Sequence, residues 1–317
     1  MRNAFAKELT ELAKENDRIV LLSGDIGNHL FDEFKKKFSS RFFNCGVAEA
    51  NMIGISSGMA LSGLRPITYT IASFATVRCL EQIRNDLCYH RVPVIVVGVG
   101  GGLSYANLGA THHSCEDIAM IRSLPNMTIV CPGDPIEVRY ALREALCYEG
   151  PVYIRLGKKG EPIIHEDKID FSLGKALTLR YGKEVCLLST GNLLPTAVHV
   201  AERLSLEGIS TGVVSFHTVK PLDISALNGI FTRYRLVVGM EEHSLIGGFC
   251  SAISEYLVDH MPHNATKFLR LGTEDRFLCL AGSQNYAREV FSLSVDKIFS
   301  CVIKRYQNSH REISSLC

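Results

Sequence analysis

The sequence predicts an α/β protein made of two open-sheet α/β domains. Short strands alternate with helices along the chain, a pattern typical of βαβ units and mainly parallel sheets. The run 92–99 is almost continuously apolar, which is typical of a strand buried on both faces. A length of 317 residues is sufficient for two domains, each with its own core.

The first half, 1–165, is predicted to form one domain. It opens with an amphipathic helix and a strand, and the long apolar strand lies near its middle. A glycine-rich loop, expected to be flexible, follows that strand. In order, the expected elements are a helix at 3–15, strands at 19–22 and 66–71, a helix at 76–89, a strand at 92–99, the loop at 98–109, a strand at 127–131, a helix to about 148 and a strand at 151–155.

Residues 166–183 are predicted to link the two domains, because they are rich in Lys, Gly, Asp and Glu and lack a long apolar period. The second domain is predicted to be 184–317, with a polar tail after Tyr306 that is expected to be mobile. Its expected elements are strands at 184–191, 211–216 and 236–240, a helix at 195–206, and a long helix after the glycine pair 247–248.

The composition is that of an ordinary soluble globular protein, with 46% hydrophobic and 21% charged residues. A formal net charge of +1 gives no electrostatic reason to expect nucleic acid or an anionic membrane as partner. Because charges begin at Arg2 and no apolar run approaches the length of a membrane span, we expect neither a signal peptide nor a membrane segment.

The eleven cysteines lie singly and never form Cys-x-x-Cys. Cys131, Cys186 and Cys250 lie inside apolar segments, where cysteine behaves as a small hydrophobic residue. This pattern indicates neither a disulfide framework nor a zinc site, and we expect no metal ligands. A reducing cytoplasm is the expected compartment.

The stretch 43–60 is predicted to be a strand end, a glycine turn and a helix of small residues. Small residues along a helix allow another backbone or a flat ligand to approach closely. The helix carries one carboxylate near its start, Glu49, where an acid suits the positive end of the helix dipole. From spacing alone, Glu49 is either a helix-start acid or a site residue.

Other polar residues follow predicted strands. The turn 23–27 presents Asp25 at the carboxyl edge of the sheet, where ligands bind in such folds, although it lacks the Gly-x-Gly-x-x-Gly spacing of a dinucleotide loop. The glycine-rich loop ends in His112 and His113. Adjacent histidines point in different directions, so this pair is a poor chelate and serves either capping and packing or catalysis.

These motifs resemble the C-terminal half of transketolase-like enzymes. The resemblance spans about 3–306 and implies a pyrimidine-binding domain for thiamine diphosphate (ThDP), followed by a transketolase C-terminal domain. The motifs that carry it include Asp25-Ile26-Gly27, Gly46-Val47-Ala48-Glu49, Phe74, Gly109-Ala110-Thr111-His112, Asp117, Pro132-Gly133-Asp134, Lys220-Pro221-Leu222-Asp223 and Glu242-His243.

The resemblance implies a catalytic role for Glu49. In the family, a carboxyl at this position forms a hydrogen bond to N1′ of the aminopyrimidine and favours its imino tautomer, which takes the C2 proton of the thiazolium ring. Phe74 matches the aromatic residue that stacks on that pyrimidine. Asp25 and Ile71 are expected to complete the cofactor site.

The resemblance also implies which residues contact substrate. His112 matches a histidine that touches the donor hydroxyl and the intermediate, and His113 is expected beside it. Leu108 stands where the family has an acid that reads a hydroxyl, and glycines replace the basic residues of the preceding loop. Lys158 keeps a cation at a family phosphate-binding position but has no bidentate fork. We therefore expect an unusual sugar substrate.

The resemblance further implies a partner polypeptide. The family's diphosphate-binding domain, with its Gly-Asp-Gly…Asn-Asn magnesium motif, is not in this chain. ThDP and Mg²⁺ are therefore expected to be shared with, and mainly held by, a separate subunit. An α₂β₂ heterotetramer that includes self-dimerisation of this chain is expected.

The expected activity is transfer of a two-carbon ketol unit from a ketose to an aldehyde, by the small subunit of a split transketolase. The alternatives are a 2-oxoacid dehydrogenase β subunit, a 1-deoxyxylulose-5-phosphate-synthase-like enzyme and a non-catalytic paralogue. The run 109–112 favours ketol transfer over the dehydrogenase. Retention of Glu49 and Phe74 argues against an idle site.

Overall fold

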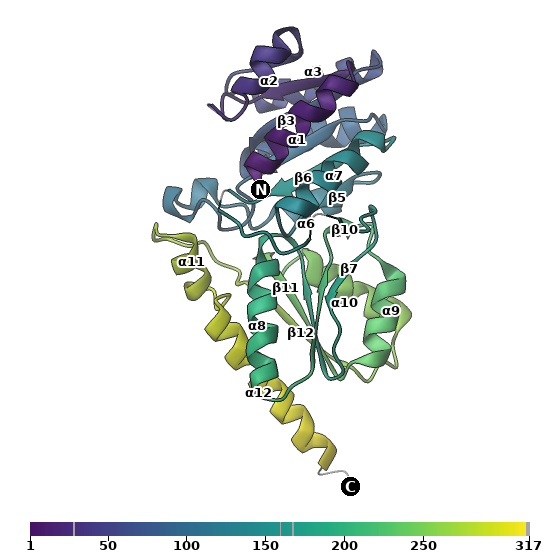
Figure 1. Cartoon of the computed structure of the whole chain (residues 1–317), viewed down its shortest axis with the longest axis vertical. Helices are drawn as coiled ribbons and strands as arrows, with labels where there is room; N and C mark the ends of the chain where they lie inside the picture. Colours follow the sequence, from purple (N-terminus) through teal and green to yellow (C-terminus); the bar gives the residue numbers. More distant parts are fainter. Residues whose placement is uncertain (28, 159, 167, 315–317) are drawn as a thin grey trace.

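Two sheets, each covered by helices, make up the molecule. A computed structural model describes residues 1–27, 29–158, 160–166 and 168–314. In Figure 1 the purple-to-teal half lies above the green-to-yellow half, and each half is built around one sheet. Within the described residues, one sheet has seven strands and the other has five. The predicted fold class, two open-sheet α/β domains, is confirmed.

The first sheet consists of β1 (Ile19–Ser23), β2 (Phe42–Asn44), β3 (Arg65–Ile71), β4 (Ile95–Val99), β5 (Thr128–Val130), β6 (Val152–Leu156) and β10 (Thr218–Lys220). Their order is β10-β5-β6-β4-β3-β1-β2. All neighbours pair in parallel except β10 and β5 at one edge. Strands β1, β4 and β6 are buried at every residue, because helices cover both faces of the sheet.

The second sheet consists of β7 (Leu177–Arg180), β8 (Val185–Ser189), β9 (Thr211–Ser215), β11 (Leu236–Ser244) and β12 (Lys267–Thr273). Their order is β12-β11-β8-β9-β7. Among the described strands of this sheet, only the edge pair of β7 and β9 is antiparallel. The stretch 166–183, predicted as a linker, contains strand β7. The backbone of β7 pairs with β9, so this part of the stretch belongs to the second sheet.

The α-helices are α1 (Arg2–Glu15), α2 (Asp32–Lys37), α3 (Glu49–Leu61), α4 (Ala72–Thr76), α5 (Leu80–Gln82), α6 (Asp117–Arg122), α7 (Pro135–Cys147), α8 (Leu194–Leu206), α9 (Ile224–Arg233), α10 (Phe249–His260), α11 (Gln284–Val290) and α12 (Val295–Ser314). On the first sheet, α1 and α7 contribute to the core on one face, and α3 and α6 to the core on the other. On the second sheet, α8 and α12 share one core, while α9 and α10 cover the other face.

Short helical turns complete the described elements. They are η1 (Ser39–Arg41), η2 (Val77–Cys79), the π-helix η3 (Ile83–Tyr89), η4 (Ala106–Leu108), η5 (Ala110–His112) and η6 (Gly191–Leu193). The prediction of a single regular helix at 76–89 is wrong in two respects: the helical structure begins earlier, and it is not one continuous α-helix. Helical structure begins directly after β3, and its turns change from α to 3₁₀, α and π.

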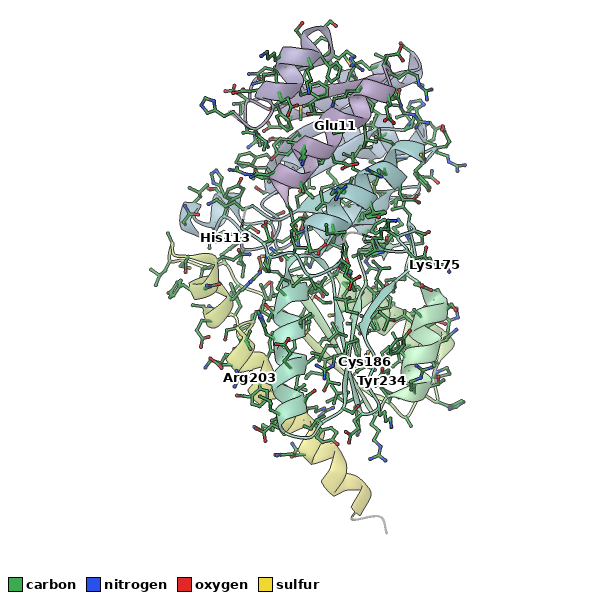
Figure 2. The ribbon with its side chains drawn as sticks, in the orientation of Figure 1. Glu11, His113, Lys175, Cys186, Arg203 and Tyr234 are labelled. Carbon is green, nitrogen blue, oxygen red and sulfur yellow. The ribbon has the colours of Figure 1, made fainter. Side chains whose placement is uncertain are left out.

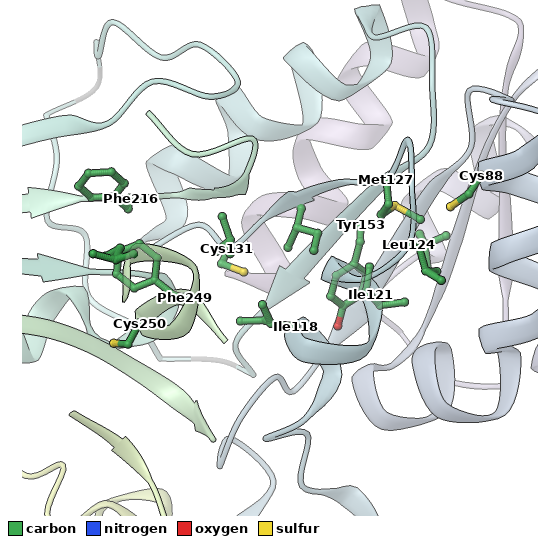
Figure 3. Close-up of a cluster of buried hydrophobic side chains, with 14 of the residues drawn as sticks. Cys88, Ile118, Ile121, Leu124, Met127, Cys131, Tyr153, Phe216, Phe249 and Cys250 are labelled. Atoms are coloured by element: carbon green, nitrogen blue, oxygen red, sulfur yellow. The ribbon is translucent and has the colours of Figure 1, made fainter. Parts of the chain in front are cut away.

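One hydrophobic core joins the two halves. Figure 3 shows Cys88, Ile121 and Tyr153 of the first half in a cluster that continues to Phe216 and Phe249 of the second. The edge strand β10 strengthens this junction, because its chain neighbours belong to the second half while its backbone pairs with the first sheet. Relative motion of the halves would therefore open both a core and a strand pair.

The glycine-rich loop at 98–109 is packed, so the expectation that it is flexible is wrong for most of its length. Residues 98–106 are buried. Gly102 has a left-handed backbone (φ 65°), and a Cβ there would lie 2.5 Å from the carbonyl oxygen of Glu242. The Glu242 carboxylate also accepts a hydrogen bond from the backbone N–H of Leu103 (2.7 Å). The second half therefore fixes the loop.

Two other features bear on the predictions. The tail expected to be mobile after Tyr306 continues helix α12 to Ser314. All ten cysteines that the structure describes are free thiols, and Cys131, Cys186 and Cys250 are fully buried, as the apolar pattern predicts. In the described part of the chain, no helix combines the length and apolar character needed to cross a membrane.

Candidate active site

Glu49 is a buried acid at the carboxyl ends of β1 and β3. It begins α3, and its side chain is 1% exposed. The Thr70 hydroxyl donates a hydrogen bond to Oε1 (3.2 Å), and the Arg78 guanidinium donates one to Oε2 (2.9 Å). Gly24, directly after β1, permits this close approach, because a Cβ there would lie 2.9 Å from the Thr70 hydroxyl oxygen.

Phe74 lies on α4, the short helix that follows β3. The guanidinium of Arg78 lies over its ring, with Cζ 4.3 Å from the ring centroid. The same guanidinium is paired with Glu49. Two residues predicted to bind the cofactor, Glu49 and Phe74, therefore contact the same flat group.

His112 extends this arrangement. Its ring centroid lies 5.2 Å from that of Phe74 and 6.4 Å from that of Tyr105, both in edge-on geometry. The Thr111 hydroxyl lies 3.0 Å from its Nδ1. Burial lowers the pKa of His112, and the neighbouring His113 lowers it further. The ring is therefore mainly neutral at physiological pH and able to accept a proton.

Lys158, at the end of β6, reaches the same group of residues. Its Nζ lies 5.0 Å from the centroid of Tyr105 and 3.4 Å from the side-chain oxygen of Asn107. Tyr105 contacts His112 in turn. These contacts form a continuous series, which we name the contact chain: Glu49, Arg78, Phe74, His112, Tyr105 and Lys158.

A cavity of about 480 Å³ opens beside the contact chain, lined in part by Phe74, Arg78, Thr111 and His113. His113 is buried, and its Nε2 has no hydrogen-bond partner among the described residues. Figure 2 shows His113 where the first half meets α11. A buried ring nitrogen without a partner can be satisfied by a polar ligand group, and the role of His113 as a substrate residue stays a prediction.

The other predicted site residues lie outside the contact chain. Asp25 is exposed just after β1 and accepts a hydrogen bond from the side-chain amide of Asn44 (2.9 Å). Ile71 is half-buried and ends β3. Leu108 is exposed in η4. Their proposed contacts with cofactor or substrate stay predictions.

A second buried network begins at the cavity wall with Asp117. Asp117, at the start of α6, accepts hydrogen bonds from the Tyr153 hydroxyl (2.7 Å) and the Arg155 guanidinium (2.8 Å). Arg155 also donates to the backbone carbonyl of Ser114 (2.7 Å). Burial raises the pKa of Asp117, but the charges of Arg155 and His243 outweigh burial and hold that pKa below its ordinary value. The network fixes the backbone just after His113.

Sequence reasoning missed three residues of the site: Thr70, Tyr105 and Arg78. Arg78 follows Phe74 by four residues, a spacing that places two side chains on one helix face. The predicted helix began after Phe74, so this relation was hidden. Tyr105 lies within the loop expected to be flexible, and Thr70 lies within a strand that pattern alone marks as buried. Neither gave a separate signal.

Comparisons with known proteins identify the family of this chain. A family model described as the transketolase pyrimidine binding domain matches residues 1–161, and one described as the transketolase C-terminal domain matches residues 174–298. The chain belongs to the transketolase family. The resemblance identified from the motifs is therefore confirmed at the level of both domains.

The relatives include transketolase subunits. The chain is 36% identical over 299 residues to a 6-deoxy-6-sulfo-D-fructose transketolase subunit from Clostridium sp. strain MSTE9, covering 94% of this chain and 92% of the relative. It is 35% identical over 261 residues to a subunit of the apulose-4-phosphate transketolase from Phocaeicola vulgatus, covering 82% and 84%. A solved structure of a split gene transketolase, an inactive β4 tetramer, matches with a TM-score of 0.86 and 34% identity over 96% of this chain and 97% of that chain.

The residues of the site fit one half of ThDP. A planar guanidinium already lies between the Glu49 carboxyl and the Phe74 ring, so these two side chains can hold a flat, nitrogen-bearing ring. Within the described residues, no group of three or more His, Cys, Asp or Glu side chains is placed to hold a metal ion. The transketolase family uses ThDP, and this chain carries the pyrimidine side of the site.

Proposed function

We propose that the chain is the small subunit of a split, ThDP-dependent transketolase that transfers a two-carbon ketol unit from a ketose to an aldehyde. The observation that carries the proposal is the contact chain. It combines a buried acid, a stacking ring and a neutral imidazole, and its members Phe74 and Arg78 line a cavity. An acid at this depth beside an aromatic ring suits activation of an aminopyrimidine better than it suits structure alone.

Bound ThDP would supply the electron sink for cleavage and formation of carbon–carbon bonds. Glu49 would hold a proton at the pyrimidine ring nitrogen, with Thr70 orienting its carboxyl through the second oxygen. Phe74 would fix the plane of that ring by stacking. Asp25 and Ile71, at the ends of β1 and β3, would lie at the cofactor's edge.

His112 would orient the reacting hydroxyl groups of the sugar and exchange a proton with them, because its ring is mainly neutral. His113 would hydrogen-bond the substrate through its unpaired Nε2. Leu108 would form no hydrogen bond to the hydroxyl group of the acceptor sugar. Lys158 would attract an anionic substituent of the sugar as a point charge. These features support an unusual sugar substrate, in line with the names of two relatives, which are transketolase subunits for 6-deoxy-6-sulfo-D-fructose and apulose 4-phosphate.

A separate subunit would hold the diphosphate and Mg²⁺. The proposed complex is an α₂β₂ heterotetramer in the cytoplasm, with the site completed by the partner. The similarity to subunits of split transketolases supports the partner, and the free thiols support a reducing compartment.

The test is to co-express the chain with a subunit that carries the diphosphate-binding domain. ThDP binding is measured by calorimetry, and ketol transfer is followed over a panel of phosphorylated, sulfonated and unsubstituted sugars. Assembly, ThDP binding and turnover are expected only for the complex. Full activity of this chain alone would contradict the split site, and pyruvate oxidation without ketol transfer would instead favour a 2-oxoacid dehydrogenase.

A further inference from the structure

We infer that Arg78 is a built-in stand-in for the cofactor's aminopyrimidine, which occupies the pyrimidine position in the free subunit and must leave when the cofactor enters. The inference rests on the proposed function and concerns what fills the site before assembly. It identifies Arg78 as a residue that sets the apparent affinity for the cofactor.

The geometry carries the inference. A guanidinium and an aminopyrimidine are both flat, and both present N–H groups at their edge. Arg78 lies face-on to Phe74 at 4.3 Å and donates to Glu49 Oε2 at 2.9 Å. Stacking on Phe74 and a hydrogen bond to Glu49 are also the two contacts proposed for the aminopyrimidine. The two groups therefore exclude each other.

A stand-in is needed because the pocket is costly when empty. Glu49 is almost fully buried, and a buried carboxylate oxygen that loses its hydrogen-bond partner destabilises the fold. Thr70 satisfies only one of its oxygens. Arg78 satisfies the other and holds the Phe74 ring in its stacking position, so that the pocket keeps its shape in the free subunit.

Arg78 is also able to leave. Its side chain is 44% exposed, and it lines the 480 Å³ cavity. It lies on η2, a short 3₁₀ turn beside the exposed Val77, and the backbone need not move for a long side chain to swing into the cavity. By contrast, Glu49 is fixed by α3 and Phe74 by α4. The exchange therefore requires one side-chain rotation.

The stand-in has a thermodynamic consequence. Because only the open form accepts cofactor, the apparent dissociation constant equals the intrinsic constant divided by the fraction of the subunit in the open form. Removal of the guanidinium should therefore tighten cofactor binding, while it destabilises the subunit that lacks cofactor. A residue that only assisted cofactor binding would give weaker binding on removal.

The test compares Arg78→Met with wild type in the full complex with the partner subunit. Met retains apolar bulk against Phe74 but cannot pair with Glu49. The matched control is Arg84→Met, an exposed arginine of η3. We expect Arg78→Met to bind ThDP roughly tenfold more tightly by calorimetry, while the midpoint of thermal unfolding of the cofactor-free chain falls. Arg84→Met should match wild type in both.

Arg78→Gln keeps a neutral N–H donor for Glu49 but loses the guanidinium over Phe74, so it should tighten ThDP binding less than Arg78→Met, and it provides the comparison if the methionine variant does not fold. ThDP binding by wild type together with equal or weaker binding by both Arg78 variants would overturn the inference and leave the proposed function intact. Absence of ThDP binding in wild type and variants alike would overturn the proposed function and this inference with it.

Discussion

Glu49 and Asp117 are two buried carboxylates that lie near the same cavity, and each is paired with an arginine. Asp117 and Arg155 are 0% and 4% exposed, and Arg155 has further bonds to backbone carbonyls. Glu49 is equally buried, but its partner Arg78 is 44% exposed and lies on the cavity wall. We call the Asp117–Arg155 pair closed, because both side chains are buried, and the Glu49–Arg78 pair open, because its arginine is partly exposed.

The two arginines differ in how firmly the surrounding structure holds them. Arg155 cannot leave Asp117 without opening the junction between the two halves, because it also binds the carbonyl oxygens of Ser114 and Glu242. In the described part of the chain, the Arg78 guanidinium is held by the Glu49 carboxylate and the face of Phe74, without such backbone anchors. A buried acid whose partner can be exchanged is suited to a ligand, and one whose partner is locked is suited to hold the fold.

The largest effect is expected when the closed pair is broken. Arg155→Met should lower the free energy of unfolding by about 3–5 kcal/mol, because it leaves the buried Asp117 carboxylate uncompensated. Arg78→Met should lower it by only about 1–2 kcal/mol, since water from the cavity can replace the guanidinium. Urea denaturation of the full chain measures both. Equal losses would remove the distinction between the two pairs.

An intermediate effect on the free energy of unfolding is expected for a third buried acid, Glu137, whose neighbour His165 can also titrate. Glu137 is fully buried at the start of α7, 3.4 Å from Nε2 of His165, and Asp134 accepts hydrogen bonds from the backbone N–H groups of Ile164 and His165. Burial raises the pKa of Glu137 from 4.5 to about 7, and it is the largest of several influences. The stabilising contribution of this carboxyl is therefore complete below pH 4.5 and is lost as the pH rises through about 7.

The measurement is the free energy of unfolding at about pH 5 and about pH 8 for wild type and Glu137→Gln. The difference between the two proteins should change by about 2 kcal/mol, with wild type losing stability relative to the variant as the pH rises. His217, whose pKa is lowered to about 3, remains in both proteins. His165, whose pKa is raised, loses the charge of Glu137 in the variant but keeps Asp134 as its neighbour. Glu144→Gln on the same helix is the control, and a pH-independent difference would contradict the assignment.

The smallest effect is expected for an exposed pair that also bridges the two halves. Arg122 of α6 donates two hydrogen bonds to Glu255 of α10 (2.7 and 2.6 Å). Because Glu255 is more than half exposed, Glu255→Gln should cost at most about 1 kcal/mol at low salt and less at about 1 M salt. Asp259→Asn is the control. If Glu255→Gln lowered the free energy of unfolding as much as Arg155→Met does, the exposure of an ion pair would not determine its contribution to stability.

The sequence predicted the fold class and most strands, because the strands of parallel sheets are short apolar runs with helices between them. It missed the place of β10, a strand of three residues whose partner is set by tertiary packing rather than by its own pattern. It also missed that the loop at 98–109 is held by Glu242, since a glycine-rich stretch has the same composition whether it is free or packed.

The site was predicted only in part. Glu49, Phe74 and His112 could be named because their spacing follows a family pattern, and the structure brings all three together. Arg78 could not be named, because its role depends on a side-chain contact across two short helices. The difference between the closed and open ion pairs depends on burial, which the residue types alone do not report.

The central claim is that Glu49 controls a proton of the bound cofactor. The most direct test is the rate at which the C2 proton of ThDP exchanges with deuterium in the assembled complex, measured by NMR after rapid quenching. Glu49→Gln should slow this exchange by roughly 10²- to 10⁴-fold, whereas Glu81→Gln, at a nearby exposed acid, should leave it unchanged. Exchange at the wild-type rate in a Glu49→Gln complex that still binds ThDP would contradict the claim.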